Sequence, residues 1–168
     1  MERKISEQQF LAAYDSYMEA IFRFCYFKTH DKELSQDLMQ QTFLKTWAYL
    51  KDGHEVENLK AFIYKIAGNL VIDWYRKKKE QSLEDLAEQG FDPVDENMET
   101  QRYAEAEWAM KSLDKLEPED KDLIIWRYVE SYTPKEIADM LEQKVNTISV
   151  RIHRAVERLK KILHEQEF

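Results

Sequence analysis

The residues best suited to chemistry lie near the C-terminal end of the chain, in a stretch with helical periodicity. Apolar residues recur there from Ile148 to Ile162, which predicts one buried face on a helix that begins at about Val145. The opposite face carries hydroxyl groups, an imidazole and cations. The side chains on it that could contact DNA are Thr147, Ser149, Val150, Arg151, His153, Arg154 and Arg158. Cations of this kind contact phosphates, and arginines can also reach base edges in the major groove.

A shorter helix is predicted immediately before this one. Thr133 can cap it, Pro134 suits its first position, and Glu136 follows Thr133 by three residues, which completes a capping box. A basic face on a terminal helix is often only solvated. The cap, the tight turn and the arginines near the start of the second helix favour a helix-turn-helix that enters the DNA major groove.

A second chemical pattern lies on a helix predicted from about Leu59 to about Lys78. Basic residues, an amide and aromatic rings are interleaved on it, a combination that suits single-stranded nucleic acid. The candidates are Lys60, Tyr64, Lys65, Asn69, Ile72, Arg76 and Lys77. The alternative is a core helix with a solvated polar edge, whose basic end complements the helix dipole.

A third face lies on the helix predicted from Asp31 to about Leu50. Its outward positions are polar but mostly uncharged, and they include a leucine. The residues are Asp37, Gln40, Gln41 and Leu44. Such a surface suits a protein partner better than DNA.

The composition predicts an all-α protein. The 168 residues include only three Gly and three Pro, and runs with strand-like alternation are missing. Residues 80–107 carry ten acidic side chains against one basic side chain, so we expect two small helical domains at 1–79 and 100–168, joined by an acidic linker at 80–99. The formal net charge is −8, so any contact with DNA must come from local patches.

The sequence argues against an enzyme. The four histidines are scattered, and we find neither metal-ligand spacing nor a glycine-rich phosphate loop, so no catalytic residue, metal or cofactor is expected. The one cysteine, Cys25, lies among aromatic residues and is expected to be buried. No apolar run approaches the roughly 18 residues of a membrane span, and no signal peptide is evident, so a cytoplasmic protein without membrane insertion is expected.

Three segments together resemble the bacterial RNA polymerase sigma factors of the extracytoplasmic-function (ECF) group. Residues 37–47 resemble the helix of that family that binds core polymerase. Residues 59–70, with Asp73 and Arg76, are similar to the element that reads the −10 promoter region. Residues 116–118, 127–128, 136–138 and 147–155 resemble the domain that reads the −35 element. The three segments occur in the order of the family and cover nearly the whole chain.

The resemblance implies a sigma factor that directs promoter-specific initiation. Its region 2-like domain would bind the clamp of the β′ subunit through Asp37, Gln40, Gln41 and Leu44, and would capture a flipped base of the melted −10 strand near Asn69. The region 4-like helix-turn-helix domain would bind the −35 duplex and lie near the flap of the β subunit. The linker would run through the polymerase near the RNA exit path. The resemblance also implies an anti-sigma factor as a partner.

The chain departs from the family pattern at several positions. Gln41 stands where an acidic residue is usual, and Gly68 replaces an arginine before Asn69. Lys144 replaces a serine cap, and Glu142 and Asn146 stand where glycines are common. The turn between the last two helices must therefore form without glycine, and Asn146 is expected to adopt the unusual backbone angles. Ser149 and Val150 replace a more basic or polar pair, which leaves −35 base readout mainly to Arg151, His153 and Arg154.

Two other classes of protein remain open from the residues alone. A helix-turn-helix repressor or activator with an N-terminal ligand or dimer domain would bind a palindromic operator without polymerase. The aromatic and basic helix and the acidic linker argue against it. A helical bundle for protein interaction is disfavoured by the two basic faces.

Overall fold

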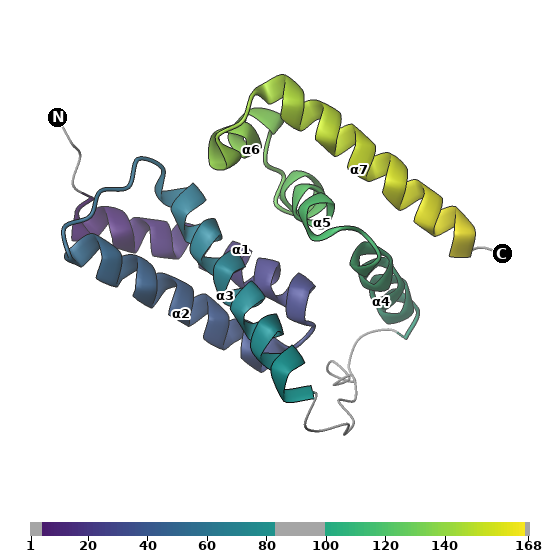
Figure 1. The fold of residues 1–168 in the computed structure, drawn as a ribbon, viewed down its shortest axis with the longest axis horizontal. Coiled ribbons are helices and arrows are strands. Elements are labelled where there is room, and N and C mark those ends of the chain that lie inside the picture. The colour runs from purple at the N-terminus through teal and green to yellow at the C-terminus, as the bar shows by residue number, and fades with distance from the viewer. Residues whose placement is uncertain (1–4, 83–99, 167–168) are drawn as a thin grey trace. The chain divides into compact units, whose positions relative to one another are not determined.

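The computed structural model describes residues 5–82 and 100–166, and every regular element in these ranges is a helix (Figure 1). The all-α prediction is therefore confirmed. The chain divides into two compact units, Met1–Asp92 and Pro93–Phe168. Residues 83–99, most of the predicted acidic linker, lie outside the described residues. None of the described helices is both long and apolar enough to cross a membrane.

Three long helices form the N-terminal unit: α1 (Glu7–Thr29), α2 (Lys32–Lys51) and α3 (Leu59–Ser82). Local signals set where the first two begin. Ser6 and Gln9 form a capping box at α1, and the Asp31 carboxylate accepts a hydrogen bond from the Leu34 backbone N–H at 2.9 Å at the start of α2. The turn between them is made by His30, which adopts the left-handed conformation with φ 55°.

The core of this unit is built from one face of each helix. Its most buried large side chains include Phe24 and Ile21 of α1, Phe43 of α2 and Ile63 of α3. The hydroxyl groups of the buried Thr42 and Thr46 donate to backbone carbonyls one turn earlier at 2.7 and 2.8 Å, so their burial leaves no unpaired hydroxyl. Each helix packs against the other two, which turns the opposite faces of α2 and α3 to solvent.

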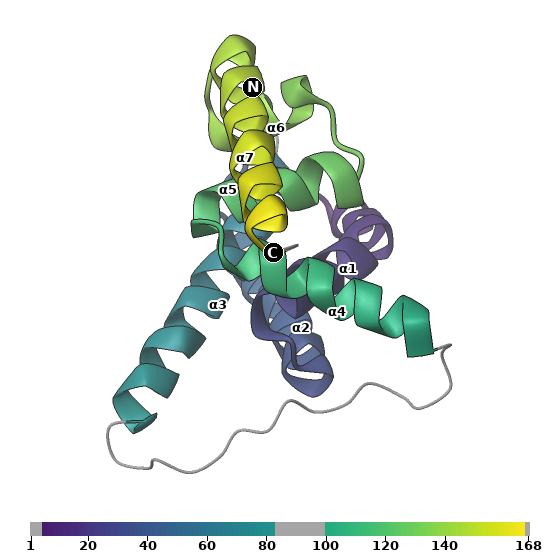
Figure 2. The same cartoon turned by 90° about the vertical axis from the view of Figure 1, so that its right-hand side faces the viewer.

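The C-terminal unit contains α4 (Thr100–Asp114), α5 (Pro118–Ile124), α6 (Pro134–Leu141) and α7 (Val145–Gln166), and a π-helical turn (η1, Ile125–Val129) follows α5 directly. The helix α7 packs against α5 and α6 (Figure 2). Ile125, Ile137, Ile148 and Ala155 are fully buried in the core of this unit. The predicted short helix, tight turn and longer helix are thus present, and the Thr133–Glu136 capping box opens α6.

The turn between α6 and α7 corrects one prediction. Glu142, rather than Asn146, adopts the left-handed conformation, with φ 53°. Its backbone N–H bonds to the Ala138 carbonyl, as does that of Gln143 at 3.0 Å, so the turn closes before Asn146 is reached. Asn146 lies inside α7, where its backbone is helical.

Candidate nucleic-acid and protein-binding faces

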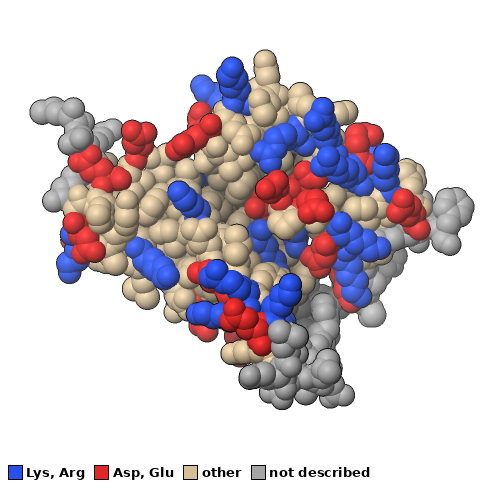
Figure 3. All heavy atoms as spheres, viewed as in Figure 1, with Lys and Arg blue, Asp and Glu red and all other residues tan. Residues whose placement is uncertain are grey.

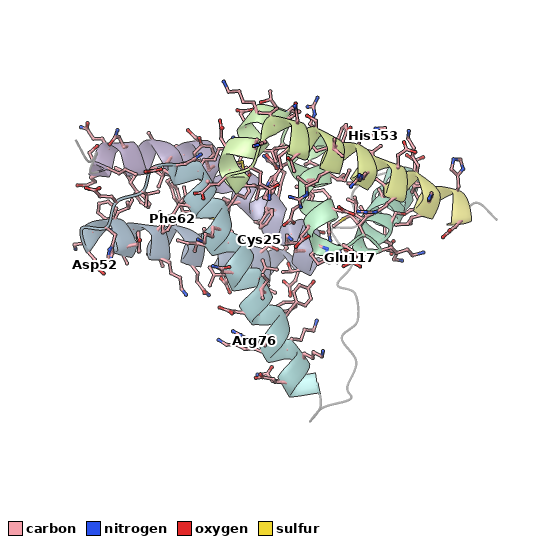
Figure 4. All side chains as sticks on the ribbon, turned by 45° about the horizontal axis from the view of Figure 1, so that its top comes forward. Cys25, Asp52, Phe62, Arg76, Glu117 and His153 are labelled. Carbon is pink, nitrogen blue, oxygen red and sulfur yellow. The ribbon has the colours of Figure 1, made fainter. Side chains whose placement is uncertain are left out.

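The exposed side of α7 begins in its first turn. Thr147, Ser149, His153 and Arg154 are exposed, and Val150 keeps 49% of its surface in solvent. Lys and Arg side chains gather over this helix in Figure 3, and Figure 4 shows His153 on its outer side. The arrangement follows from Ile148, Ile152 and Ala155, which turn the opposite side of the helix into the core.

Two of the predicted arginines have partners within the protein. Arg151 is half-buried, and its Nη1 donates to Gln143 Oε1 in the preceding turn at 2.9 Å. Arg158 is exposed but forms an ion pair with Asp120 of α5, a residue that is only 7% exposed. Arg151 is therefore held beside the turn, and Arg158 ties α7 to α5.

Sequence reasoning passed over one exposed residue of α7. The sequence predicts Asn146 to lie in the turn, but in the structure it lies in the first turn of the helix, exposed and four residues before Val150. Its side chain has no hydrogen-bond partner among the described residues. The spacing of four residues between Asn146 and Val150 could have indicated this position, because residues four apart lie on the same face of a helix.

The polar side of α3 brings together four of its seven predicted residues. Lys65, Asn69, Ile72 and Arg76 are all exposed and follow one side of the helix. Arg76, labelled in Figure 4, pairs with Asp73 one turn earlier at 2.6 Å. This side presents an amide flanked by two cations, which can bond to a base edge and to phosphates.

The other three candidates of α3 lie elsewhere. Tyr64 is only 4% exposed, and its ring packs edge-on against Phe24 at a centroid distance of 5.3 Å, so it belongs to the core. Lys60 is half-buried with its ammonium 5.9 Å from the ring centroid of Tyr17. Lys77 is exposed, but it directly follows Arg76 and so projects from a side about 100° away.

An aromatic cluster that sequence reasoning missed lies where α2 ends and α3 begins. The ring of Tyr49 stacks on that of His54 at 4.4 Å and contacts that of Phe62 at 4.7 Å. Tyr49 and His54 are exposed, and Phe62, which is labelled in Figure 4, is half-buried. His54 and Phe62 lie 5 and 13 residues after Tyr49 in the sequence, and the three belong to α2, the following loop and α3, so no helical periodicity links them.

The outward face of α2 is arranged as predicted from its periodicity. Asp37, Gln40 and Gln41 are exposed, and Leu44 keeps 68% of its surface in solvent. Leu38, Met39 and other residues on the opposite side fill the core. The result is a polar surface with one prominent apolar side chain, which is suited to a protein partner.

Cys25 takes no part in these faces. Burial raises the pKa of its thiol to about 12, although the nearby Lys28 acts in the opposite direction. The thiol is therefore protonated and unreactive at neutral pH. Among the described residues, no group of His, Cys, Asp or Glu side chains is arranged to hold a metal ion.

Comparison with known proteins accounts for both units. Residues 13–81 match the sigma-70 region 2 family, and residues 106–159 match sigma-70 region 4. The ECF RNA polymerase sigma factor SigW of Bacillus subtilis is 27% identical over 176 aligned positions, which cover 97% of this chain and 93% of SigW. The chain belongs to the ECF sigma factors. It is therefore a promoter-specificity factor for transcription initiation by RNA polymerase, and not an enzyme.

Other similar proteins agree with this membership. The sigma factor YlaC of Bacillus subtilis is 26% identical over 154 aligned positions, covering 88% of each chain. Two solved structures share the fold of this sigma factor. One is the sigma factor RpoE bound to the anti-sigma factor NepR from Bartonella quintana, with a TM-score of 0.65 and 22% identity over 94% of this chain and 98% of that chain. The other is CnrH bound to the cytosolic domain of CnrY, with a TM-score of 0.66 and 20% identity over 95% of this chain and 90% of that chain.

Proposed function

We propose that this sigma factor divides promoter recognition between α7 and α3. The exposed side of α7 docks in the major groove of the −35 element. The polar side of α3 binds the melted −10 strand. The N-terminal and C-terminal units thus supply one DNA-binding helix each, in keeping with their membership of regions 2 and 4.

The observation that carries the −10 assignment is the exposure of Asn69 between Lys65 and Arg76. The amide can hydrogen-bond to an unstacked base, and the cations can hold the phosphates on either side. The Tyr49–His54–Phe62 cluster adds aromatic faces on which a base could stack. With Tyr64 in the core, this cluster replaces it as the aromatic part of the proposed site.

The outward face of α2 is the proposed contact with core RNA polymerase. Leu44 would fill an apolar pocket on the clamp of the β′ subunit, while Asp37, Gln40 and Gln41 surround it with polar contacts. The C-terminal unit would lie against the flap of the β subunit. The protein would act in the cytoplasm with the polymerase.

An anti-sigma factor is the proposed regulator. RpoE, which shares the fold, was solved in complex with the anti-sigma factor NepR, and CnrH, which also shares it, was solved with the cytosolic domain of CnrY. A partner that covers the face of α2 would block access to polymerase.

The test combines polymerase binding with promoter opening. The purified chain should co-elute with bacterial core RNA polymerase. Asn69→Ala should retain this binding but lower both the permanganate reactivity of −10 thymines and the transcript yield. A template with a mismatched bubble should restore only part of the transcript, because the contact to the base is missing.

Gln8→Ala provides a matched control, since Gln8 is an exposed amide on α1 of the same unit. It should open promoters like the parent protein. If Asn69→Ala opens the promoter as the parent does, Asn69 does not contact the melted −10 strand. Failure of the parent to bind core polymerase, combined with tight binding to a palindromic duplex, would favour a helix-turn-helix repressor instead.

A further inference from the structure

Three exposed side chains follow one another along a single side of α7. Asn146, Val150 and Arg154 are spaced by four residues, and each is exposed. At about 1.5 Å per residue, the three span roughly 12 Å of helix. That length corresponds to about three or four base pairs at 3.4 Å per step.

The fold leaves these three side chains available for DNA. The turn before α7 is closed by Glu142, so Asn146 is not needed for it. Arg151 is hydrogen-bonded to Gln143 and Arg158 is paired with Asp120. The structure gives the side chains of Asn146 and Arg154 no hydrogen-bond or ion-pair partner among the described residues.

The chemistry of the first two residues matches A·T base pairs. A side-chain amide can accept a hydrogen bond from adenine N6 and donate one to adenine N7, and only adenine presents that pair in the major groove. An exposed aliphatic side chain matches the C5-methyl group of thymine. Asn146 and Val150 are four residues apart, a rise of about 6 Å, so the two bases would lie about two steps apart.

We infer that Asn146 and Val150 determine specificity for A·T pairs within the −35 element. Asn146 bonds to an adenine, and Val150 contacts a thymine methyl group about two base pairs away. The inference rests on the proposed docking of α7 in the major groove and assigns the bases that two of its residues select.

The first experiment measures base preference directly. The full-length protein is combined with bacterial core RNA polymerase and used to transcribe a promoter library randomised across the −35 region. Asn146→Ala should lose a preference for adenine at one position by about 5- to 100-fold. Asn146→Asp should shift that preference towards cytosine, whose N4 amino group donates to a carboxylate.

Val150→Ala should lose a preference for thymine at a nearby position by about 3- to 5-fold, the effect of one buried methyl-sized contact. Glu165→Ala is the matched control, because Glu165 is exposed on the same helix about five turns further on. It should retain the parental preference at every position. Variants that lower transcription equally from all sequences, with the parental preference intact, would overturn the inference.

The second experiment changes the DNA and leaves the protein intact, so it does not depend on how the variants fold. Replacing the selected adenine by 7-deazaadenine removes the N7 acceptor, and replacing the selected thymine by uracil removes the methyl group. The 7-deazaadenine promoter should be transcribed less by the parent protein and equally well by Asn146→Ala. The uracil promoter should be transcribed less by the parent protein and equally well by Val150→Ala. Equal losses in parent and variant would refute the assigned contact.

These experiments also distinguish failure of the base assignment from failure of the proposed docking of α7. A parental holoenzyme with no base preference at −35 would refute the proposed function of α7 itself. A clear preference that depends on Arg154 but survives both Asn146→Ala and Val150→Ala would refute only the present inference.

Discussion

Arg158→Ala tests whether an arginine on the DNA-binding helix serves the fold instead of the DNA. Arg158 and Asp120 are 38 residues apart in sequence and form an ion pair between α7 and α5. The side chain of Arg158 is 57% exposed, while that of Asp120 is only 9% exposed. The substitution would leave the Asp120 carboxylate buried without its cation.

The magnitude follows from this asymmetry. Ion pairs in solvent contribute only about 0.2–1 kcal/mol, but a buried acceptor without a partner costs about 1–3 kcal/mol. Asp120 is the third residue of α5, where the helix dipole favours an anion and offsets about 0.3–1 kcal/mol of that cost. We therefore expect Arg158→Ala to destabilise the C-terminal unit by about 1–2 kcal/mol, which lowers its melting temperature by about 4–16 °C.

The assay compares stability with DNA binding in the same variants. Hydrogen exchange of α5 and α7 peptides should accelerate in Arg158→Ala, and adding Asp120→Asn should cost less than the sum of the two single changes. Once folded, the Arg158→Ala holoenzyme should keep the parental salt dependence of −35 binding. Arg154→Ala should show the reverse, with unchanged exchange and weaker binding. The reasoning is refuted if Arg158→Ala leaves exchange unchanged and lowers the salt slope by about one unit, as loss of a phosphate contact would.

Three further predictions concern the N-terminal unit. Gly68→Ala should raise its free energy of unfolding by about 0.5–1 kcal/mol in urea titrations, because Gly68 lies within α3 and an added Cβ meets nothing within 4 Å; a loss of stability would contradict this. Burial raises the pKa of the Cys25 thiol to about 12, so Cys25 should resist a thiol reagent at pH 8 in the native protein and react fully in urea. Rapid labelling of the native protein would show that the thiol is accessible. Leu44→Asp should abolish co-elution with core polymerase while the melting temperature stays within about 4 °C of the parental value, because the site is exposed. Leu11→Asp, at a leucine 52% exposed on α1, should bind normally; equal binding by both would move the polymerase contact away from α2.

Several features of this protein could be predicted from its sequence because they depend on residues within one or two helical turns. The Ser6–Gln9 and Thr133–Glu136 capping boxes each join residues three apart, and both are present. The buried stripe of α7 and the exposed Leu44 of α2 follow from helical periodicity in the same way. The two family regions were also evident, because their motifs lie within single helices or adjacent ones.

Other features were decided only by the packing of distant segments. Tyr64 and Asn69 share one helix, but the approach of Phe24 on α1 makes the first a core residue and leaves the second exposed. The role of Arg158 depends in the same way on Asp120, which comes from another helix. The Tyr49–His54–Phe62 cluster spans the end of α2, the short segment that follows and the start of α3, so its formation depends on the path of that segment and not on the periodicity of either helix. Helical periodicity specifies which side of a helix is apolar, but the neighbours that pack on that side determine which polar residues at its edge remain free for DNA.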